Sequence, residues 1–293
     1  MIYSRLARPF DAVRSLRGLT VTDELKVLLS LMVGYLATTI YKVLKSAKPS
    51  IEKRFGGSRT DFITKQTNLK YILNITSDGF YFVIRPRIYD YEMTSLQYEP
   101  EVKRVFRPKQ GEVIIDVGSC IGAYTIRPSR IVGKDGLVVA LEPDPENFKL
   151  LSMNIRLNEL SNVIALPAAA YENDGTHLLY IKGVGEHSLH KAHVIKIHGK
   201  SNGEIKVSTI TLDTLIKKLN LKRVDWAKID VEGAELSVLK GASNALEIVR
   251  KLIVEVWNET ANEVLSILQQ RRYKTTVLCK YGWGMYILAE KQA

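Results

Sequence analysis

The chain has 293 residues, of which 46% are apolar and 25% are charged, so its composition excludes disordered, collagen-like and disulfide-rich proteins. It has two cysteines, Cys120 and Cys279, which favours a reducing compartment and a cytoplasmic location. The net charge is +11, and residues 1–54 hold ten Lys or Arg against four Asp or Glu. Such a segment either meets an acidic partner, such as anionic lipid or nucleic acid, or forms a solvated basic face.

Residues 1–60 are expected to form a basic helical extension. Residues 27–41 contain no charge, and Pro49 ends the helix that they predict. This run of 15 residues is shorter than the ~20 of a membrane-spanning helix, so a span is the least favoured reading. We expect residues 25–48 to self-associate, to pack as a buried helix, or to lie peripherally on a membrane surface. Residues 1–24 lack the pattern of a signal peptide.

A β-hairpin and a lead-in segment are predicted over residues 61–108. Residues 69–88 are rich in β-forming side chains on both sides of the turn sequence at 77–79. Residues 89–107 have mixed character and are predicted to form a loop and a short helix. Pro108 and Gly111 mark the entry to a third segment, residues 109–293.

This third segment alternates between strand and helix patterns. Strands are predicted at residues 112–117, 137–142, 163–168, 225–229 and 251–256; helices at 123–132, 145–158, 212–219, 234–241 and 259–270; further β-structure at 177–181 and 206–211; and a closing hairpin at 275–278 and 285–290. The alternation predicts an α/β domain with a mostly parallel sheet covered by helices. The closing hairpin indicates that one late strand runs antiparallel.

The first predicted strand ends in an acid and a glycine turn, Asp116-Val-Gly118-Ser-Cys120-Ile-Gly122. Such a turn lets a ligand lie against bare backbone at the start of a helix. Cys120 stands at the middle glycine position of a dinucleotide-binding turn, where its side chain would obstruct a pyrophosphate. An acid at position 116 suits a ligand with an ammonium group, such as S-adenosylmethionine.

The next predicted strand ends in Glu142-Pro143, 26 residues after Asp116. An acid in this place can accept hydrogen bonds from both ribose hydroxyls of a nucleoside. Glu142 alone could be a surface residue, but its position at the tip of the adjacent strand favours a binding role.

Three acids, Asp230, Glu232 and Glu235, follow the strand predicted at 225–229. A single acid there would be an ordinary helix cap. Three acids after one strand favour a binding site, because open α/β sheets bind ligands in a crevice at the carboxyl ends of their strands. We expect Asp230 to lie near the cofactor's sulfonium and Glu232 to act on the substrate side. Glu235 can serve the first turn of the following helix.

Taken together, these motifs resemble the FkbM-type methyltransferases, which are S-adenosylmethionine-dependent O-methyltransferases. The matching segments are DVGSCIG at 116–122, LEPDPENFKLLSMNIRLN at 141–158, TLDTL at 211–215, KIDVEGAELSVLKGA at 228–242 and LIVEV at 252–256. The resemblance covers about residues 79–260. It implies a Rossmann-like seven-stranded sheet with the last strand antiparallel, and S-adenosylmethionine as cofactor.

The resemblance also implies which residues contact the cofactor. Asp116, Gly118 and Glu142 carry that role, and Asp230 joins them near the sulfonium. Around them we expect Ser119, Gly122, Thr125, Pro143 and Ala169. The chain departs from the family at Ser119-Cys120, where Ala-Asn is common, and at Pro128, where the family continues with helix-forming residues.

The catalytic candidates are Glu232, Asp230 and His187, because an alcohol must lose its proton during methyl transfer. Glu255 is a further candidate, and His187 also fits a solvent-exposed loop. All five histidines fall within residues 177–198 without a zinc signature, so no metal is expected.

The expected acceptor is a hydroxyl of a sugar, glycolipid or small metabolite. Nucleic-acid methylation is disfavoured, since no Asn-Pro-Pro-aromatic motif is present and the basic residues concentrate outside the catalytic segment. A non-catalytic scaffold for a membrane or protein partner is a third reading, against which the acids at 116, 142 and 230 argue.

Overall fold

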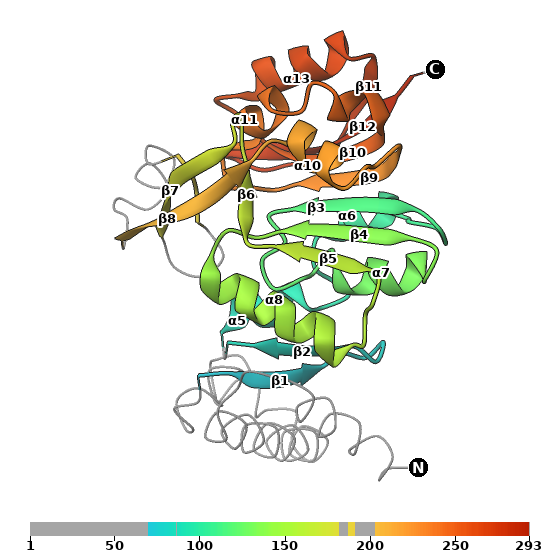
Figure 1. The fold of residues 1–293 in the computed structure, drawn as a ribbon, viewed down its shortest axis with the longest axis vertical. Coiled ribbons are helices and arrows are strands. Elements are labelled where there is room, and N and C mark those ends of the chain that lie inside the picture. The colour runs from blue at the N-terminus through green and yellow to red at the C-terminus, as the bar shows by residue number, and fades with distance from the viewer. Residues whose placement is uncertain (1–69, 86, 182–186, 191–202, 293) are drawn as a thin grey trace. The chain divides into compact units, whose positions relative to one another are not determined.

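The computed structural model describes residues 70–85, 87–181, 187–190 and 203–292 (Figure 1). The helix predicted within residues 25–48, with its membrane or self-association role, lies outside the described residues. The chain divides into two compact units, Met1–Tyr98 with Ser152–Leu160, and Glu99–Leu151 with Ser161–Ala293. Within the described ranges, no helix has the length and apolar character needed to cross a membrane.

The described part of the first unit contains the predicted hairpin. Its strands are β1 (Ile72–Ile75) and β2 (Tyr81–Ile84), which pair antiparallel, and helix α5 (Ile88–Met93) follows. At the turn, the backbone N–H of Phe80 donates to Thr76 Oγ1 at 3.0 Å. The hairpin prediction is therefore confirmed.

Two asparagines one helical turn apart satisfy the free backbone edge of β2. Asn154 Oδ1 accepts a hydrogen bond from the N–H of Val83 at 2.6 Å, and Asn158 Oδ1 accepts one from the N–H of Tyr81 at 3.0 Å. Their amide nitrogens donate to the carbonyls of the same two strand residues. Since an exposed strand edge is a template for unwanted pairing, these side chains both anchor and protect it.

The second unit is built on a seven-stranded sheet (Figure 1). Its strands in spatial order are β11 (Tyr273–Lys280), β12 (Gly284–Lys291), β10 (Val249–Trp257), β9 (Val224–Ile229), β3 (Val113–Val117), β4 (Leu137–Leu141) and β5 (Val163–Leu166). Strand β12 is antiparallel to both of its neighbours, while β10, β9, β3, β4 and β5 run parallel. The prediction of a Rossmann-like sheet with a late antiparallel strand is confirmed.

Seven helices are described besides α5: α6 (Pro100–Val105), α7 (Ile126–Val132), α8 (Pro145–Leu157), α10 (Leu212–Lys218), α11 (Glu235–Lys240), α12 (Ala245–Ile248) and α13 (Ala261–Gln270). A smaller sheet has the order β6 (Ala168–Ala170), β8 (Gly203–Ile210), β7 (Gly175–Ile181). The strand predicted at 163–168 is thus wrong in its extent. Pro167 has no N–H for a strand ladder, and the chain changes sheet at this residue.

Helix α7 begins at Ile126 and not at residue 123, as the sequence predicted. The later start places Pro128 in the first turn, where its missing N–H would have no partner in the helix in any case. Pro128 therefore fits the helix without a kink.

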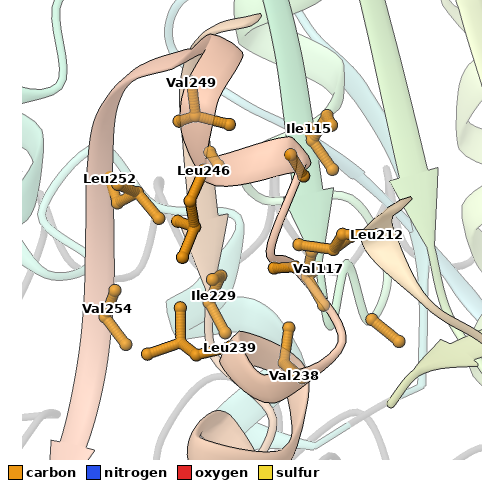
Figure 2. Packing of buried hydrophobic residues seen from close by; sticks show 14 of the residues in the cluster. Ile115, Val117, Leu212, Ile229, Val238, Leu239, Leu246, Val249, Leu252 and Val254 are labelled. Atoms are coloured by element: carbon orange, nitrogen blue, oxygen red, sulfur yellow. The ribbon is translucent and has the colours of Figure 1, made fainter. Parts of the chain in front are cut away.

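One large hydrophobic cluster of the second unit lies on one face of the large sheet. Alternate strand residues, including Val117, Ile229 and Val254, are fully or nearly fully buried against Val238 and Leu239 of α11 (Figure 2). Because side chains along a strand alternate between faces, the intervening positions point to the other side. Those intervening positions carry the charged residues of the candidate site.

Candidate active site

In-register pairing brings charged and polar residues from four strands to one face of the sheet. Asp116 of β3 pairs with Lys228 of β9, which also pairs with Ile253 of β10. Glu255, two residues beyond Ile253, faces the same side and pairs with Tyr286 of β12. These residues lie toward the carboxyl ends of the parallel strands, the edge at which open α/β sheets bind ligands.

The turn after β3 is closed by hydrogen bonds to Asp116. Thr125 Oγ1 donates to Asp116 Oδ2 at 2.6 Å, and Ser119 Oγ donates to the Asp116 carbonyl at 2.8 Å. Burial raises the pKa of Asp116 to about 6, although the Lys228 ammonium lowers it. A buried carboxyl of this kind gains from a cationic ligand, which fits the ammonium group expected of the cofactor.

Gly118 crosses closely over the start of the loop after β9. Its φ is +83°, and a Cβ added to it would overlap the backbone carbonyl oxygen of Asp230. Glycine is therefore required twice here, for the left-handed backbone and for the close approach. The contact couples the first acidic turn to the third.

We expect Gly118→Ala to destabilise the fold by about 3 kcal/mol and to weaken S-adenosylmethionine binding at least tenfold, because two backbone segments must separate. Gly111→Ala is the matched control. Gly111 has a φ of +77° with nothing within 4 Å of an added Cβ, so it carries only the backbone cost of about 1 kcal/mol. Urea unfolding and calorimetry measure both quantities. If the two variants lost the same free energy of unfolding and the same cofactor affinity, the close approach of Gly118 to Asp230 would be contradicted.

Glu142 is fixed at the end of β4 by groups from both sides. Its Oε2 accepts the N–H of Cys120 at 2.7 Å, and its Oε1 accepts the N–H of Asp144 at 2.9 Å. Burial raises the pKa of Glu142 to about 7, and these backbone N–H groups counteract the rise. Asn147 Nδ2 also donates to Oε1, at 3.4 Å. A carboxylate has about four acceptor sites, so about one remains open for a ribose hydroxyl. The residues present therefore fit the nucleoside of S-adenosylmethionine.

Cys120 holds its N–H toward Glu142 by adopting a φ of +48°. Asn tolerates this left-handed region better than most non-glycine residues, which agrees with the Asn that the FkbM resemblance leads us to expect at this position. The departure at position 120 changes the side chain but keeps the backbone hydrogen bond.

A buried lysine is the centre of the polar face. Lys228 Nζ lies 2.6 Å from Asp230 Oδ2 and 3.8 Å from Glu99 Oε2, and 4.5 Å from the centre of the Tyr124 ring. Tyr286 Oη donates to both carboxylates, at 3.0 Å to Asp230 and 3.2 Å to Glu99. Burial alone would lower the pKa of Lys228, but the surrounding carboxylates outweigh it and raise the pKa. Asp230 is thereby held in one orientation by Lys228 and Tyr286.

Three carboxylates gather beside this lysine. Oxygen atoms of Asp230, Glu232 and Glu255 all lie within 4.8 Å of one another, and we call this set the acid trio. Burial, followed by the charges of its acidic neighbours, raises the pKa of Glu255 well above its usual value. A divalent cation could also bridge oxygens at this spacing. The cation that the structure places beside Asp230 is the Lys228 ammonium.

The structure places the other predicted cofactor residues around the first two turns. Gly122 has a φ of +102° where the chain enters α7, Pro143 lies between the two acids that follow β4, and Ala169 is buried on β6. Their contacts with the cofactor stay predictions.

His187 lies apart from the acid trio, at the acidic end of β4. Its Nε2 is 3.9 Å from Asp144 Oδ2, and its side chain is 9% exposed. Within the described ranges, the atoms gathered in the acid trio come from carboxylates and not from histidine. His193 and His198 lie outside the described residues. The catalytic role proposed for His187 stays a prediction.

Sequence reasoning missed the residues that surround Asp230: Glu99, Tyr124, Lys228 and Tyr286. Lys228 stands within the quoted motif KIDVEGAE, so its position two residues before Asp230 was a usable signal, because it puts both side chains on one strand face. Glu99 and Tyr286 are 187 residues apart, so no local sequence pattern predicts their hydrogen bond.

The sheet topology and the acidic turns after β3, β4 and β9 define an S-adenosylmethionine-dependent methyltransferase of the Rossmann-like class. A family model described as "Methyltransferase FkbM domain" matches residues 116–275, and the chain belongs to this family.

Three similar proteins illustrate the relationship. The hexuronic acid methyltransferase AglP of Haloferax volcanii is 27% identical over 190 residues, which are 64% of this chain and 74% of that protein. The methyltransferase sdnD of Sordaria araneosa is 29% identical over 192 residues, 56% of this chain and 74% of that protein. A crystal structure of a SAM-dependent methyltransferase from Aquifex aeolicus has a TM-score of 0.42 and 18% identity, covering 69% of this chain and 93% of that one.

Proposed function

We propose that this methyltransferase methylates a hydroxyl oxygen of a sugar, glycolipid or small metabolite. The observation that carries the proposal is the acid trio, which gathers where β9 and β10 end. A hydroxyl acceptor must lose a proton, and carboxylates within hydrogen-bond reach can both orient it and accept that proton. Similarity to a hexuronic acid methyltransferase supports a sugar as the acceptor class.

The surroundings of each acidic residue favour a different role in cofactor binding or catalysis. Asp116 and Glu142 hold the ammonium and ribose ends of the cofactor, as their burial and remaining acceptor sites favour. When bound, S-adenosylmethionine supplies an electrophilic methyl group. Asp230 is engaged by Lys228 and Tyr286, which makes it an orienting group.

Glu255 is our candidate for the proton acceptor. It is 5% exposed, and its raised pKa makes its carboxylate a stronger base than an exposed glutamate. Trp257 Nε1 donates to Glu255 Oε2 at 3.1 Å and fixes the direction of the carboxyl group. Glu232 stands beside it, half-buried, where it can accept a second acceptor hydroxyl.

The test is Glu255→Gln, assayed with tritiated S-adenosylmethionine and a panel of pyranosides, uronic acids, glycolipids and simple alcohols. Methyl transfer should fall by about 100-fold or more, because a general base contributes that much, while cofactor affinity stays within about twofold. Glu290→Gln, on neighbouring β12 and half-exposed, is the matched control and should stay active. Unchanged transfer by Glu255→Gln would refute its role. A wild-type chain that binds the cofactor but methylates no hydroxyl would refute the proposed function.

A further inference from the structure

Three aromatic side chains form a stack beside the acid trio, and two of them, Trp283 and Tyr281, have no part in the proposed methyl-transfer chemistry. The Trp257 and Trp283 rings are 4.4 Å apart between centroids at an interplanar angle of 29°. The Tyr281 and Trp283 rings are 5.1 Å apart at 14°. Trp257 is buried, but Trp283 and Tyr281 remain 37% and 42% exposed. We call these three residues the aromatic stack.

The turn that carries the stack is held firmly to the end of β10. The N–H of Tyr281 donates to the carbonyl of Gly284 at 2.7 Å, and the N–H of Asn258 donates to the carbonyl of Trp283 at 3.0 Å. A Cβ on Gly284 would overlap the backbone carbonyl oxygen of Val256, so glycine allows this close approach. The exposed rings are therefore preorganised on a rigid hairpin.

The stack is continuous with the acid trio at two points. Trp257 Nε1 donates to Glu255 Oε2 at 3.1 Å. Tyr281 meets the ring of Tyr286 edge-on at 6.2 Å, and Tyr286 Oη lies 3.0 Å from Asp230 Oδ2. Glu255 and Trp257 are two residues apart on β10 and share a face of the sheet. The stack is thus in direct contact with side chains that belong to the acid trio or hold it in place.

We propose that the aromatic stack binds the ring of a pyranose acceptor that carries no negative charge; this rests on the proposed function and names its substrate class. The face of an aromatic ring is electron-rich and attracts the polarised C–H groups on the flat side of a pyranose. Trp283 stacks against both Trp257 and Tyr281, so the pyranose would lie on Tyr281 and along the exposed edge of Trp283, which holds Tyr281 in place. The neighbouring carboxylates accept hydrogen bonds from the sugar hydroxyls.

Other occupants fit the same surface less well. A nucleotide would bring a phosphate toward the carboxylates of the acid trio, and a uronic acid would bring a carboxylate. A lipid chain would bring no hydrogen-bond donor of its own to these oxygens. Lys228, the buried cation of this face, is already engaged by Asp230 and Glu99.

Saturation-transfer NMR on the full chain, with saturating S-adenosylhomocysteine, tests the proposal. The probes are methyl β-D-glucopyranoside and methyl β-D-galactopyranoside, the acyclic polyol sorbitol, and methyl β-D-glucuronide. We expect saturation of the ring C–H protons of at least one neutral pyranoside, weaker binding of the glucuronide, and none of sorbitol, which has hydroxyls but no rigid ring face.

Two substitutions of Trp283 show whether binding needs an aromatic ring or only an apolar side chain. Trp283→Leu should weaken pyranoside binding about tenfold, whereas Trp283→Phe should keep it within about threefold. Val277→Ala is the control, since Val277 is equally exposed on β11 but lies outside the stack. Cofactor affinity, measured on every variant, reports whether the domain is intact.

The outcomes distinguish this inference from the proposed function. If the wild-type chain binds the cofactor and methylates a hydroxyl, but Trp283→Leu binds pyranosides as the wild type does, the stack is not the sugar subsite. Binding of sorbitol or of the glucuronide as strong as that of the neutral pyranosides would also overturn the proposal. If the wild-type chain methylates no hydroxyl acceptor, the proposed function itself fails.

Discussion

Glu142→Gln is expected to weaken S-adenosylmethionine binding about 30-fold at pH 8, measured by calorimetry on the full chain. The amide keeps the size of the side chain but removes its charge, so the hydrogen bonds that the ribose hydroxyls donate lose a charged acceptor. Glu142 also accepts the N–H groups of Cys120 and Asp144, so the loop that meets the nucleoside loosens as well. Glu263→Gln, an exposed acid on α13, is the control and should bind normally.

The pH dependence gives this prediction a second readout. The pKa of Glu142 is raised to about 7 by burial, and the cofactor's hydroxyls favour the ionised carboxylate. Affinity should therefore fall as the pH drops below 7 in the wild type. In Glu142→Gln this step should be absent, leaving only the contribution of Asp116, whose pKa is about 6. Equal affinity of variant and wild type at pH 8 would contradict the assignment.

Lys228→Met should lower the free energy of unfolding by about 3–5 kcal/mol, the cost of removing one partner from a buried ion pair. Lys228 is 3% exposed, and its ammonium faces Asp230 at 2.6 Å and Glu99 at 3.8 Å. Without it, two carboxylates share a buried space with no cation. The fluorescence of Trp226, two residues away on β9, reports the urea transition of this region.

Lys251→Met is the matched control on adjacent β10. Its ammonium pairs with Glu290 at 2.9 Å, but its side chain is 42% exposed, so the cost should stay below about 1 kcal/mol. In Lys228→Met the remaining carboxylates take up protons in the folded chain, so the lost stability should partly return as the pH falls. The double variant Lys228→Met, Asp230→Asn should also regain part of it. If Lys228→Met lost no more free energy of unfolding than Lys251→Met, Lys228 would not be the buried ion-pair partner of Asp230 and Glu99.

The sequence predicted the sheet because strands β3, β4 and β9 are short, largely apolar runs that are followed by an acid or end in one. Asp116, Glu142 and Asp230 were located for the same reason, since the carboxyl ends of parallel strands meet at one edge. Most strand limits differ from the prediction by one to three residues. At Pro167 the reason is local, because proline ends the pairing that the apolar pattern would continue.

The rest of the site depends on contacts between residues far apart in the chain. Glu99 reaches Lys228 from a left-handed position before α6, with a φ of 45°, and Tyr286 arrives from the antiparallel strand. The aromatic stack likewise joins β10 to the β11–β12 turn. In the sequence alone, these residues look like ordinary surface or core residues. Their roles become visible only when the register of the strands is known.

The most direct test of the account is the chemical identity of the bond that the enzyme makes. S-adenosylmethionine carrying carbon-13 in its methyl group would be incubated with the full chain and the neutral pyranosides, and the product would be examined by carbon NMR. We predict a methoxy signal correlated to a sugar ring carbon, together with its loss in Glu255→Gln. A labelled methyl group on nitrogen or carbon would contradict hydroxyl methylation at the acid trio.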